Sequence, residues 1–455
     1  MQFIPHEYQR YALSWLIRRS LIDGHEGSAY FLDPGLGKTA LTLAWVKFLK
    51  DLGVANSVLV VAPLRVISSV WPDECKKWDQ FNELTCSVVH GTKRLEAMGR
   101  EADIHLINPE AVSWLERQDK KFDVLVVDES SKFKNWSAKR TKSLKKMVPD
   151  FKYRLLLTGT PSPNSLEDLF SQMFILDQGK AFGSSITSFR NRYFYRGGYG
   201  GYKWTPFASS QDYIESKIKD SCLRLSAEDH LDLPTILLND VWVDLPKDCL
   251  VEYKRLEKEM FLLLEGEDSV TATNAGSKYL SCRQFANGGI YDEDRTSHVI
   301  HNEKVSAMIE IIEELQGKPV IVAFQFHHDL ERIRSRLHAP SIDGRTKPEE
   351  ANVLINKWNA GELPVLAVQP QSLSHGVNMQ HGPGRDIIWF GLTDNLETYQ
   401  QLNARVHRQG VTGGVRIHHL LARETVDLAI KDRLSEKGQN QSSLLESLNR
   451  YRLRN

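Results

Sequence analysis

The stretch FLDPGLGKTALTLAW at residues 31–45 decides how this sequence folds. It runs from the apolar end of a strand through a glycine-rich turn into an amphipathic helix. This order predicts a phosphate-binding loop, because backbone amides at the start of a helix face a bound anion. The residues expected around the phosphates are Gly35, Leu36, Gly37, Lys38 and Thr39.

Two side chains of this loop bring chemistry of their own. Lys38 would place a positive charge beside the phosphates, and the Thr39 hydroxyl would bind Mg²⁺. The strict motif has glycine at the position where this chain has Leu32. Because of this departure the loop alone does not identify the class of enzyme, and adenylate or small-molecule kinases also fit it.

Short apolar runs rich in β-branched residues recur in both halves of the chain. They are VLVVA (58–62), VLVVD (124–128), LLLTG (155–159), VIVAF (320–324), VLAVQ (365–369) and IIWF (387–390). Such runs suit parallel strands that helices bury on both faces. The sequence therefore predicts an α/β fold with two parallel-sheet lobes in tandem, at 1–180 and 301–455, and a mainly helical insertion at 181–300.

Composition gives few further constraints. The 455 residues include 58 basic and 58 acidic side chains, so a nucleic-acid surface would have to be local. The best candidate is 132–154, with nine Lys or Arg, although a solvated helix face explains it equally well. Five cysteines without a CxxC spacing indicate neither a disulfide framework nor a zinc site. Because there is no long apolar run and no signal-peptide pattern, we expect a cytoplasmic protein without membrane contact.

Two adjacent acids follow the buried run at 124–128. Asp128 would hold Mg²⁺ and Glu129 would polarise the attacking water. An Asp-Glu pair is usually a solvated turn, but one that ends a buried strand downstream of a phosphate loop favours catalysis.

A third element is QLNARVHRQG at 401–410. Placed on one helix, Arg405 and Arg408 share a face. Either guanidinium could stabilise the charge that spreads over a transferred γ-phosphate.

Together these elements resemble superfamily 2 helicases, specifically their Swi/Snf-type branch. The likeness covers most of the chain and keeps its motifs in order. They are PHEYQRYALSWL, DPGLGKT, VVAPLRVISSVWPDECKKW, LINPEAVSWL, DESSKFKN, LTGTPSPNSLEDLFSQ, SKYLSCRQFANGGIY, KPVIVAFQFHHDLERI, SIDGRTKPEEANVLINKWNAG and QQLNARVHRQG.

The resemblance implies a minimal bacterial or phage motor with two RecA-like lobes that uses ATP and Mg²⁺. It makes Gln9 the adenine reader, Lys38, Glu129, Arg405 and Arg408 catalytic, and double-stranded DNA the track. Residues expected to face nucleic acid are Arg65, Asn108, Thr158 and Asn378. We expect a monomer, with its protein partners unspecified.

The sequence departs from the family pattern in the loop SLSHGVN (372–378), where only Gly376 remains of a glycine-rich run. In the family this loop normally contacts DNA and nucleotide, so the departure leaves the substrate class open. Two alternatives therefore stand beside a translocase on duplex DNA. One is a helicase that separates strands of DNA or RNA. The other is an ATP-gated nucleic-acid-binding scaffold that has lost hydrolysis.

Overall fold

The computed structural model describes residues 1–159, 161–162, 165–197, 203–231, 233–264, 269–292, 294–373, 378–411 and 413–435. The chain forms two compact units, Met1–Asp232 and Leu233–Asn455. Among the described residues, no helix has both the length and the apolar character needed to cross a bilayer.

The first unit is built on a seven-stranded sheet in which all strands are parallel. In spatial order the strands are β3 (Cys86–Val88), β4 (Ile104–Ile107), β2 (Val58–Val61), β5 (Val124–Asp128), β6 (Tyr153–Thr158), β1 (Gly27–Leu32) and β9 (Cys222–Leu225). Every residue of β2, β4, β5 and β6 is buried, which explains their continuous apolar sequence.

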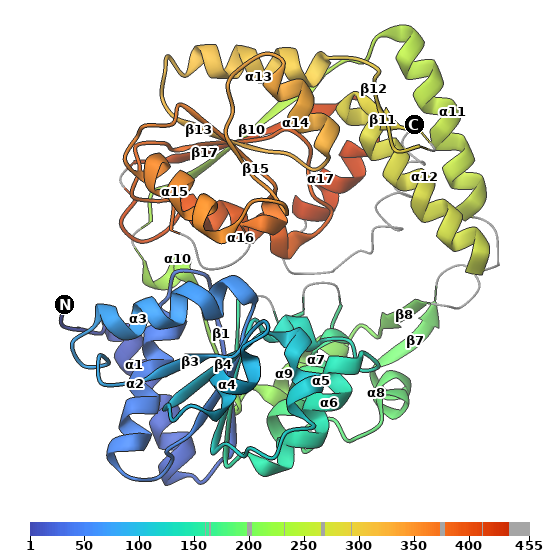
Figure 1. The fold of residues 1–455 in the computed structure, drawn as a ribbon. Coiled ribbons are helices and arrows are strands. Elements are labelled where there is room, and N and C mark those ends of the chain that lie inside the picture. The colour runs from blue at the N-terminus through green and yellow to red at the C-terminus, as the bar shows by residue number, and fades with distance from the viewer. Residues whose placement is uncertain are drawn as a thin grey trace. The chain divides into compact units, whose positions relative to one another are not determined.

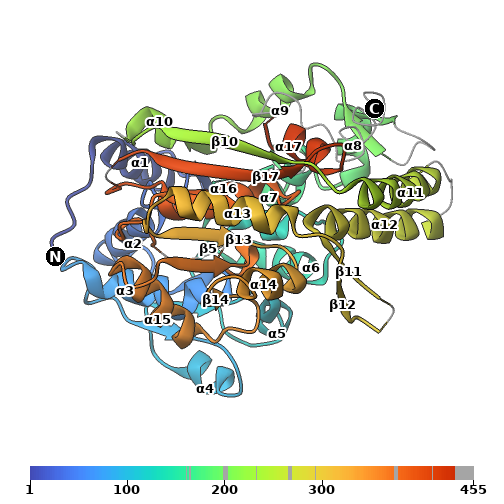
Figure 2. The same cartoon turned by 90° about the horizontal axis from the view of Figure 1, so that it is seen from above.

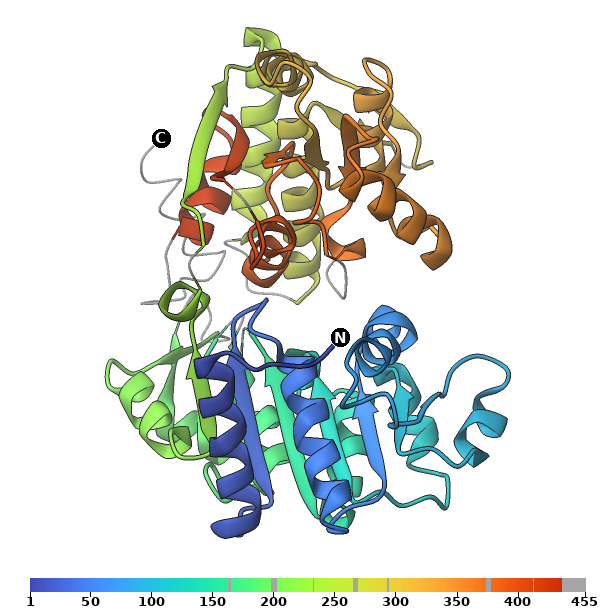
Figure 3. The same cartoon turned by 90° about the vertical axis from the view of Figure 1, so that its left-hand side faces the viewer.

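Helices cover both faces of this sheet. One side carries α1 (Glu7–Ile17), α2 (Lys38–Asp51) and α3 (Trp71–Lys77), and the other α5 (Val112–Leu115), α6 (Lys139–Met147) and α7 (Asp168–Asp177), as Figure 1 shows. Figure 3 shows α1 and α2 side by side on their face. The remaining α-helices are α4 (Arg94–Gly99), α8 (Ile186–Tyr193), α9 (Ser210–Ile218) and α10 (Ala227–His230).

The second unit is built on a six-stranded parallel sheet. Its order is β10 (Ile236–Val243), β17 (Val415–Ala422), β16 (Asp386–Trp389), β13 (Val320–Ala323), β15 (Val365–Val368) and β14 (Ser341–Ile342). Its helices are α13 (Glu303–Glu314), α14 (His327–Arg334), α15 (Pro348–Asn359), α16 (Leu396–Val406) and α17 (Asp427–Ser435). In Figure 1, α13 lies on one side of this sheet and α16 on the other.

Two long helices of the second unit, α11 (Lys247–Leu264) and α12 (Ser269–Asn287), run side by side in Figures 1 and 2. Between them, Lys278 donates to Glu259 Oε2 at 2.7 Å. Two small antiparallel sheets complete the fold. They pair β7 (Phe194–Gly197) with β8 (Lys203–Pro206), and β11 (Gly289–Tyr291) with β12 (Ser297–Val299).

The predicted fold class is confirmed: each half of the chain carries a parallel sheet, and helices dominate the stretch between the two strand sets. That stretch also supplies a strand to each sheet, because β9 pairs with β1 and β10 pairs with β17. The chain passes from the first unit to the second between residues 232 and 233. This division into two units does not test the three boundaries 1–180, 181–300 and 301–455, which stay a prediction.

Candidate functional site

The phosphate-binding loop lies between β1 and α2, as its sequence predicts. Gly35 and Gly37 adopt φ of 97° and 83°, a left-handed conformation that other residues rarely tolerate. Gly37 precedes the first helical residue, so the amides of the first turn of α2 open toward this loop. Lys38 donates from Nζ to the carbonyl oxygens of Leu32 at 2.7 Å and Asp33 at 3.3 Å.

Gln9 of α1 is tied directly to this loop. Its Nε2 donates to the Leu36 carbonyl oxygen at 3.2 Å, and its Oε1 accepts from the His6 amide at 3.0 Å. A Cβ added to Gly37 would lie 2.5 Å from Nε2, so a larger residue there would displace the Gln9 amide, and the positive φ itself favours glycine.

Asp128 is the last residue of β5, and Glu129 follows it in the same unit. Asp128 is buried, and Trp71 at the start of α3 donates from Nε1 to its Oδ2 at 3.1 Å. Burial raises the pKa of the Asp128 carboxyl, while the Trp71 hydrogen bond and the charge of Lys38 act in the opposite direction. Because the charge of Lys38 acts on this carboxyl, the loop after β1 and the acid at the end of β5 lie near each other.

Glu129 sits where the chain leaves the strand. Its φ of 57° and ψ of 58° turn the backbone into the short helix Ser130–Phe133. Behind it, Ser130 donates to Gln172 Oε1 at 2.7 Å, and Gln172 Nε2 donates to the Pro161 carbonyl oxygen at 2.6 Å. The buried Gln172 therefore joins the segment after β5 to the segment after β6.

The predicted nucleic-acid residues of the first unit share one edge of the sheet. Arg65 follows β2, Asn108 follows β4, and Thr158 is the last residue of β6. All are at carboxyl ends of parallel strands, where open α/β sheets place their ligands. Arg65 and Asn108 are half-buried, and Asn108 donates to Glu110 Oε2 at 2.7 Å. Thr158 is fully buried in the strand.

In the second unit, the helix expected to carry both arginines is shorter than predicted. α16 ends at Val406, so Arg405 is helical while Arg408 lies beyond the end. His407 leaves helical geometry, and Gly410 follows with a φ of 93°, so the two arginines do not share a helix face. Arg405 is buried, whereas the half-buried Arg408 donates to Oδ1 of the exposed Asn378 at 2.6 Å.

Most of the basic residues at 132–154 have partners within the first unit. Arg154 is buried against Glu26, Arg140 pairs with Glu110, and Lys146 pairs with Glu116. Lys145 lies over the Trp136 ring, and burial lowers its pKa to about 8. Including Lys134 with Asp168, four of the nine cations of this stretch are paired with carboxylates of the same unit.

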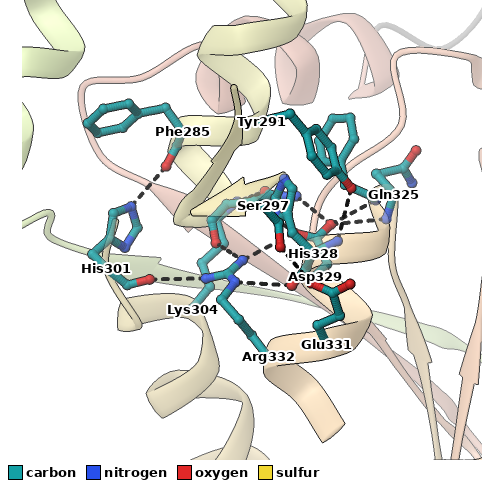
Figure 4. Close-up of polar contacts among 12 residues, drawn as sticks. Phe285, Tyr291, Ser297, His301, Lys304, Gln325, His328, Asp329, Glu331 and Arg332 are labelled. Atoms are coloured by element: carbon teal, nitrogen blue, oxygen red, sulfur yellow. Dashed lines mark hydrogen bonds and ion pairs between the residues drawn. The ribbon is translucent and has the colours of Figure 1, made fainter. Parts of the chain in front are cut away.

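Figure 4 shows a buried polar cluster in the second unit that sequence patterns did not reveal. Asp329 at the start of α14 accepts from Asn287 at 3.0 Å and from Arg332 at 3.2 Å. Lys304 donates to Asn287 Oδ1 at 2.9 Å and to Asp427 Oδ2 at 2.6 Å. These bonds fix the end of α12 to the helices of the second unit.

Some predicted features lie outside the described residues. They are Thr160 in the segment TGTP, residues 198–202 in the glycine and aromatic stretch, and 374–377 in the loop SLSHGVN. Two buried side chains that bond to Asp128 and Ser130, Trp71 and Gln172, were missed, because they are distant from those residues in the sequence. Both fall inside the motifs quoted above, which was the available signal.

Comparison with protein-family models gives two matches that follow one another along the chain. The SNF2-related domain matches residues 8–269, and the helicase conserved C-terminal domain matches residues 303–410.

Among known proteins, protein p41 of Acyrthosiphon pisum secondary endosymbiont phage 1 is 33% identical and covers 98% of this chain and 99% of its own length. The "Uncharacterized ATP-dependent helicase MG018" of Mycoplasma genitalium is 23% identical over 98% of this chain, which spans 43% of that protein. The solved SWI2/SNF2 ATPase core of Sulfolobus solfataricus in complex with dsDNA is 24% identical, with a TM-score of 0.46, and covers 96% of this chain and 92% of its own.

Proposed function

This chain belongs to the SNF2-related family of helicase-like ATPases, and we propose that it hydrolyses ATP to move along double-stranded DNA. The observation that carries the proposal is the joint placement of the phosphate loop after β1 and the acids after β5. The two strands flank β6 in one parallel sheet, and the Lys38 charge acts on the Asp128 carboxyl. This arrangement suits a nucleoside triphosphate whose phosphates lie across the edge of the sheet.

In this proposal the loop binds the phosphates with backbone amides and one charge. Gly35, Leu36 and Gly37 keep the backbone close to the anion, and Lys38 exchanges its bonds to Leu32 and Asp33 for bonds to phosphate oxygens. Gln9 can recognise adenine, because an amide presents both a donor and an acceptor to the base.

Thr39 and Asp128 suit Mg²⁺, since both offer oxygen atoms and Mg²⁺ usually takes few protein ligands in addition to phosphate and water. In the described part of the chain, no three His, Cys, Asp or Glu side chains gather as a metal site. The ion would neutralise charge on the phosphates. Glu129 would hold the attacking water and accept its proton.

Arg405 and Arg408 would supply positive charge to the transferred phosphoryl group from the second unit. Arg408 suits this role better, because it is half-buried and its guanidinium lies with Asn378 near the surface of its unit. Arg405 is buried and its backbone carbonyl accepts from the Met379 amide at 3.1 Å, so it also positions the chain next to Asn378.

Membership of the family supports a nucleic-acid partner, and we propose that Arg65, Asn108 and Asn378 lie along its track. Thr158, which was expected there from the sequence, is fully buried and offers no surface to a phosphate. Positions at strand ends and loops suit contact with phosphates, which gives grip without sequence preference. Of the possible tracks we propose duplex DNA, as the Swi/Snf-type resemblance implies.

The deciding experiment compares ATPase rates with duplex DNA, single-stranded DNA and RNA of equal length. Duplex DNA should give the largest stimulation, and the stimulation should fall as salt rises. Stimulation by single-stranded DNA or RNA, with no stimulation by duplex DNA, would refute the duplex translocase.

A strand-separating helicase is the second candidate, and the β7–β8 ribbon favours it. This two-stranded element carries the exposed aromatic side chains Tyr195 and Phe207, whose ring centroids lie 5.5 Å apart. Exposed rings can stack on unpaired bases. A displaced-strand assay with Tyr195→Ala and Phe207→Ala tests this function: unwinding that depends on these rings would support it, and ATPase activity without displacement would exclude it.

A further inference from the structure

The indole of Trp71 makes an unusual contact for a core tryptophan. Its side chain is fully buried in the first unit, and its only polar atom donates to a carboxylate oxygen of Asp128 at 3.1 Å. Asp128 ends β5, whereas Trp71 comes from the segment after β2, the neighbouring strand. The contact therefore joins the end of β5 to the helix that follows the neighbouring strand β2.

The direction of this bond restricts the carboxylate. A carboxylate at a strand end can rotate about its terminal bond unless a donor holds one of its oxygens. The indole ring is rigid and packed on all sides, so its N–H points in one direction. Because Oδ2 is held by Trp71, rotation of the carboxylate plane is restricted before any ligand arrives.

A charged acceptor also makes the bond stronger than one between neutral groups, and burial protects it from competition with water. The indole brings a donor without a positive charge, so it orients the carboxylate and leaves its negative charge available. An arginine or lysine at the same place would neutralise that charge.

We propose that Trp71 is a positioning residue that orients the Asp128 carboxylate for Mg²⁺. This inference rests on the proposed function, in which Asp128 and Thr39 hold that ion. It follows the general behaviour of metal sites, where the hydrogen-bond partners of a ligand set its orientation and affect affinity.

A core-packing role is the alternative, and the chain offers a matched control for it. Trp45 of α2 is also almost completely buried in the first unit, but its Nε1 donates to the hydroxyl of Ser20 at 3.2 Å. Trp71→Phe and Trp45→Phe both replace a buried indole by a benzene ring. Only the first removes a donor from Asp128.

The first measurement is the Mg²⁺ dependence of ATP hydrolysis in the full chain. Trp71→Phe should raise the Mg²⁺ concentration for half-maximal rate by about tenfold or more, the usual cost of losing a ligand's hydrogen-bond partner. Trp45→Phe should leave that concentration unchanged even if it lowers the melting temperature. Equal Mg²⁺ dependence in Trp71→Phe and the unmodified chain would overturn the inference.

The second measurement needs neither metal nor activity. In nuclear magnetic resonance spectra of the nucleotide-free chain, the indole N–H peak that disappears in Trp71→Phe should move in Asp128→Asn, because its acceptor changes from a carboxylate to an amide. If Trp71→Phe does not fold, Asp128→Asn alone decides, since one of the ten indole peaks should then move strongly. No movement of any indole peak would refute the contact.

Asp128→Asn also distinguishes a failure of the proposed function from a failure of the role of Trp71. Hydrolysis at the normal rate in that variant would remove Asp128 from the site and overturn the proposed function together with the inference. Loss of hydrolysis in Asp128→Asn, combined with normal Mg²⁺ dependence in Trp71→Phe, would overturn the role of Trp71 alone.

Discussion

Gln9 donates from Nε2 to the carbonyl oxygen of Leu36 at 3.2 Å, so α1 is bonded to the middle of the phosphate loop. The two residues are 27 positions apart in the sequence. The side chain proposed to recognise adenine therefore also holds the loop that receives the phosphates, and the base and the phosphates would be sensed by connected groups.

Replacing Gln9 with alanine should weaken ATP use and reduce the preference for ATP over GTP. Two neutral hydrogen bonds are at stake, which corresponds to about a tenfold loss in kcat/KM for ATP. Steady-state kinetics with both nucleotides would check this. An unchanged ratio of the two kcat/KM values would show that Gln9 supports the loop without reading the base.

Glu129→Gln should retain ATP binding and reduce turnover by about a hundredfold or more, because the amide cannot accept a proton from water. Binding of a fluorescent ATP analogue and the hydrolysis rate should be measured on the same sample. The exposed Glu101 offers a control in Glu101→Gln, which should keep the normal rate. Normal turnover in Glu129→Gln would place the catalytic base elsewhere.

Arg408→Ala should also preserve ATP binding and lower the rate, since a guanidinium that meets the γ-phosphate acts mainly in the transition state. A loss of about a thousandfold is expected for such an arginine. Arg336→Ala, at an exposed position of the same unit, serves as the control. If Arg408→Ala and Arg336→Ala both hydrolyse ATP at the rate of the unmodified chain, Arg408 has no part in the reaction.

The sequence predicted the fold well where strands are buried on both faces. β2, β5, β13 and β15 all fall within predicted runs, and β16 overlaps one, because a strand covered by helices is apolar along most of its length. β10 was missed for the opposite reason. It is the edge strand of its sheet, its first four residues are exposed, and polar side chains interrupt its apolar pattern.

The candidate site was predictable as far as it depends on local order in the chain. The phosphate loop and the acids after β5 occupy the expected ends of strands. The end of α16 before Arg408 was not predicted. The sequence is compatible with a helix that continues past His407, and the helix ends because the His407 backbone adopts a non-helical conformation. Contacts between distant segments, such as Trp71 with Asp128 or the Cys75 and Cys86 sulfurs 3.4 Å apart, leave no periodic signal.

The buried His301 of the second unit should make stability depend on pH. Its Nε2 donates to the Phe285 carbonyl oxygen at 2.9 Å, and Nδ1 finds no hydrogen-bond partner among the described residues (Figure 4). Burial lowers the His301 pKa from 6.5 to about 4. The charges of Arg332 and Lys304 act in the same direction, whereas the Phe285 hydrogen bond and the charge of Asp427 oppose the shift. The folded chain therefore keeps this ring neutral.

Because the unfolded chain binds this proton more readily, the stabilising contribution is complete above pH 6.5 and is lost as pH falls from 6.5 toward 4. The loss should approach roughly 3 kcal/mol in the free energy of unfolding, from a pKa difference of about 2.5. His301→Gln keeps a donor for the Phe285 carbonyl but cannot take up a proton. Urea unfolding of the unmodified chain and of His301→Gln should be measured at pH 7 and pH 4. The free energy of unfolding should fall less in His301→Gln between these two pH values. His338→Gln, at an exposed position, should match the unmodified chain. A loss of the same size in His301→Gln would assign the acid sensitivity to other groups.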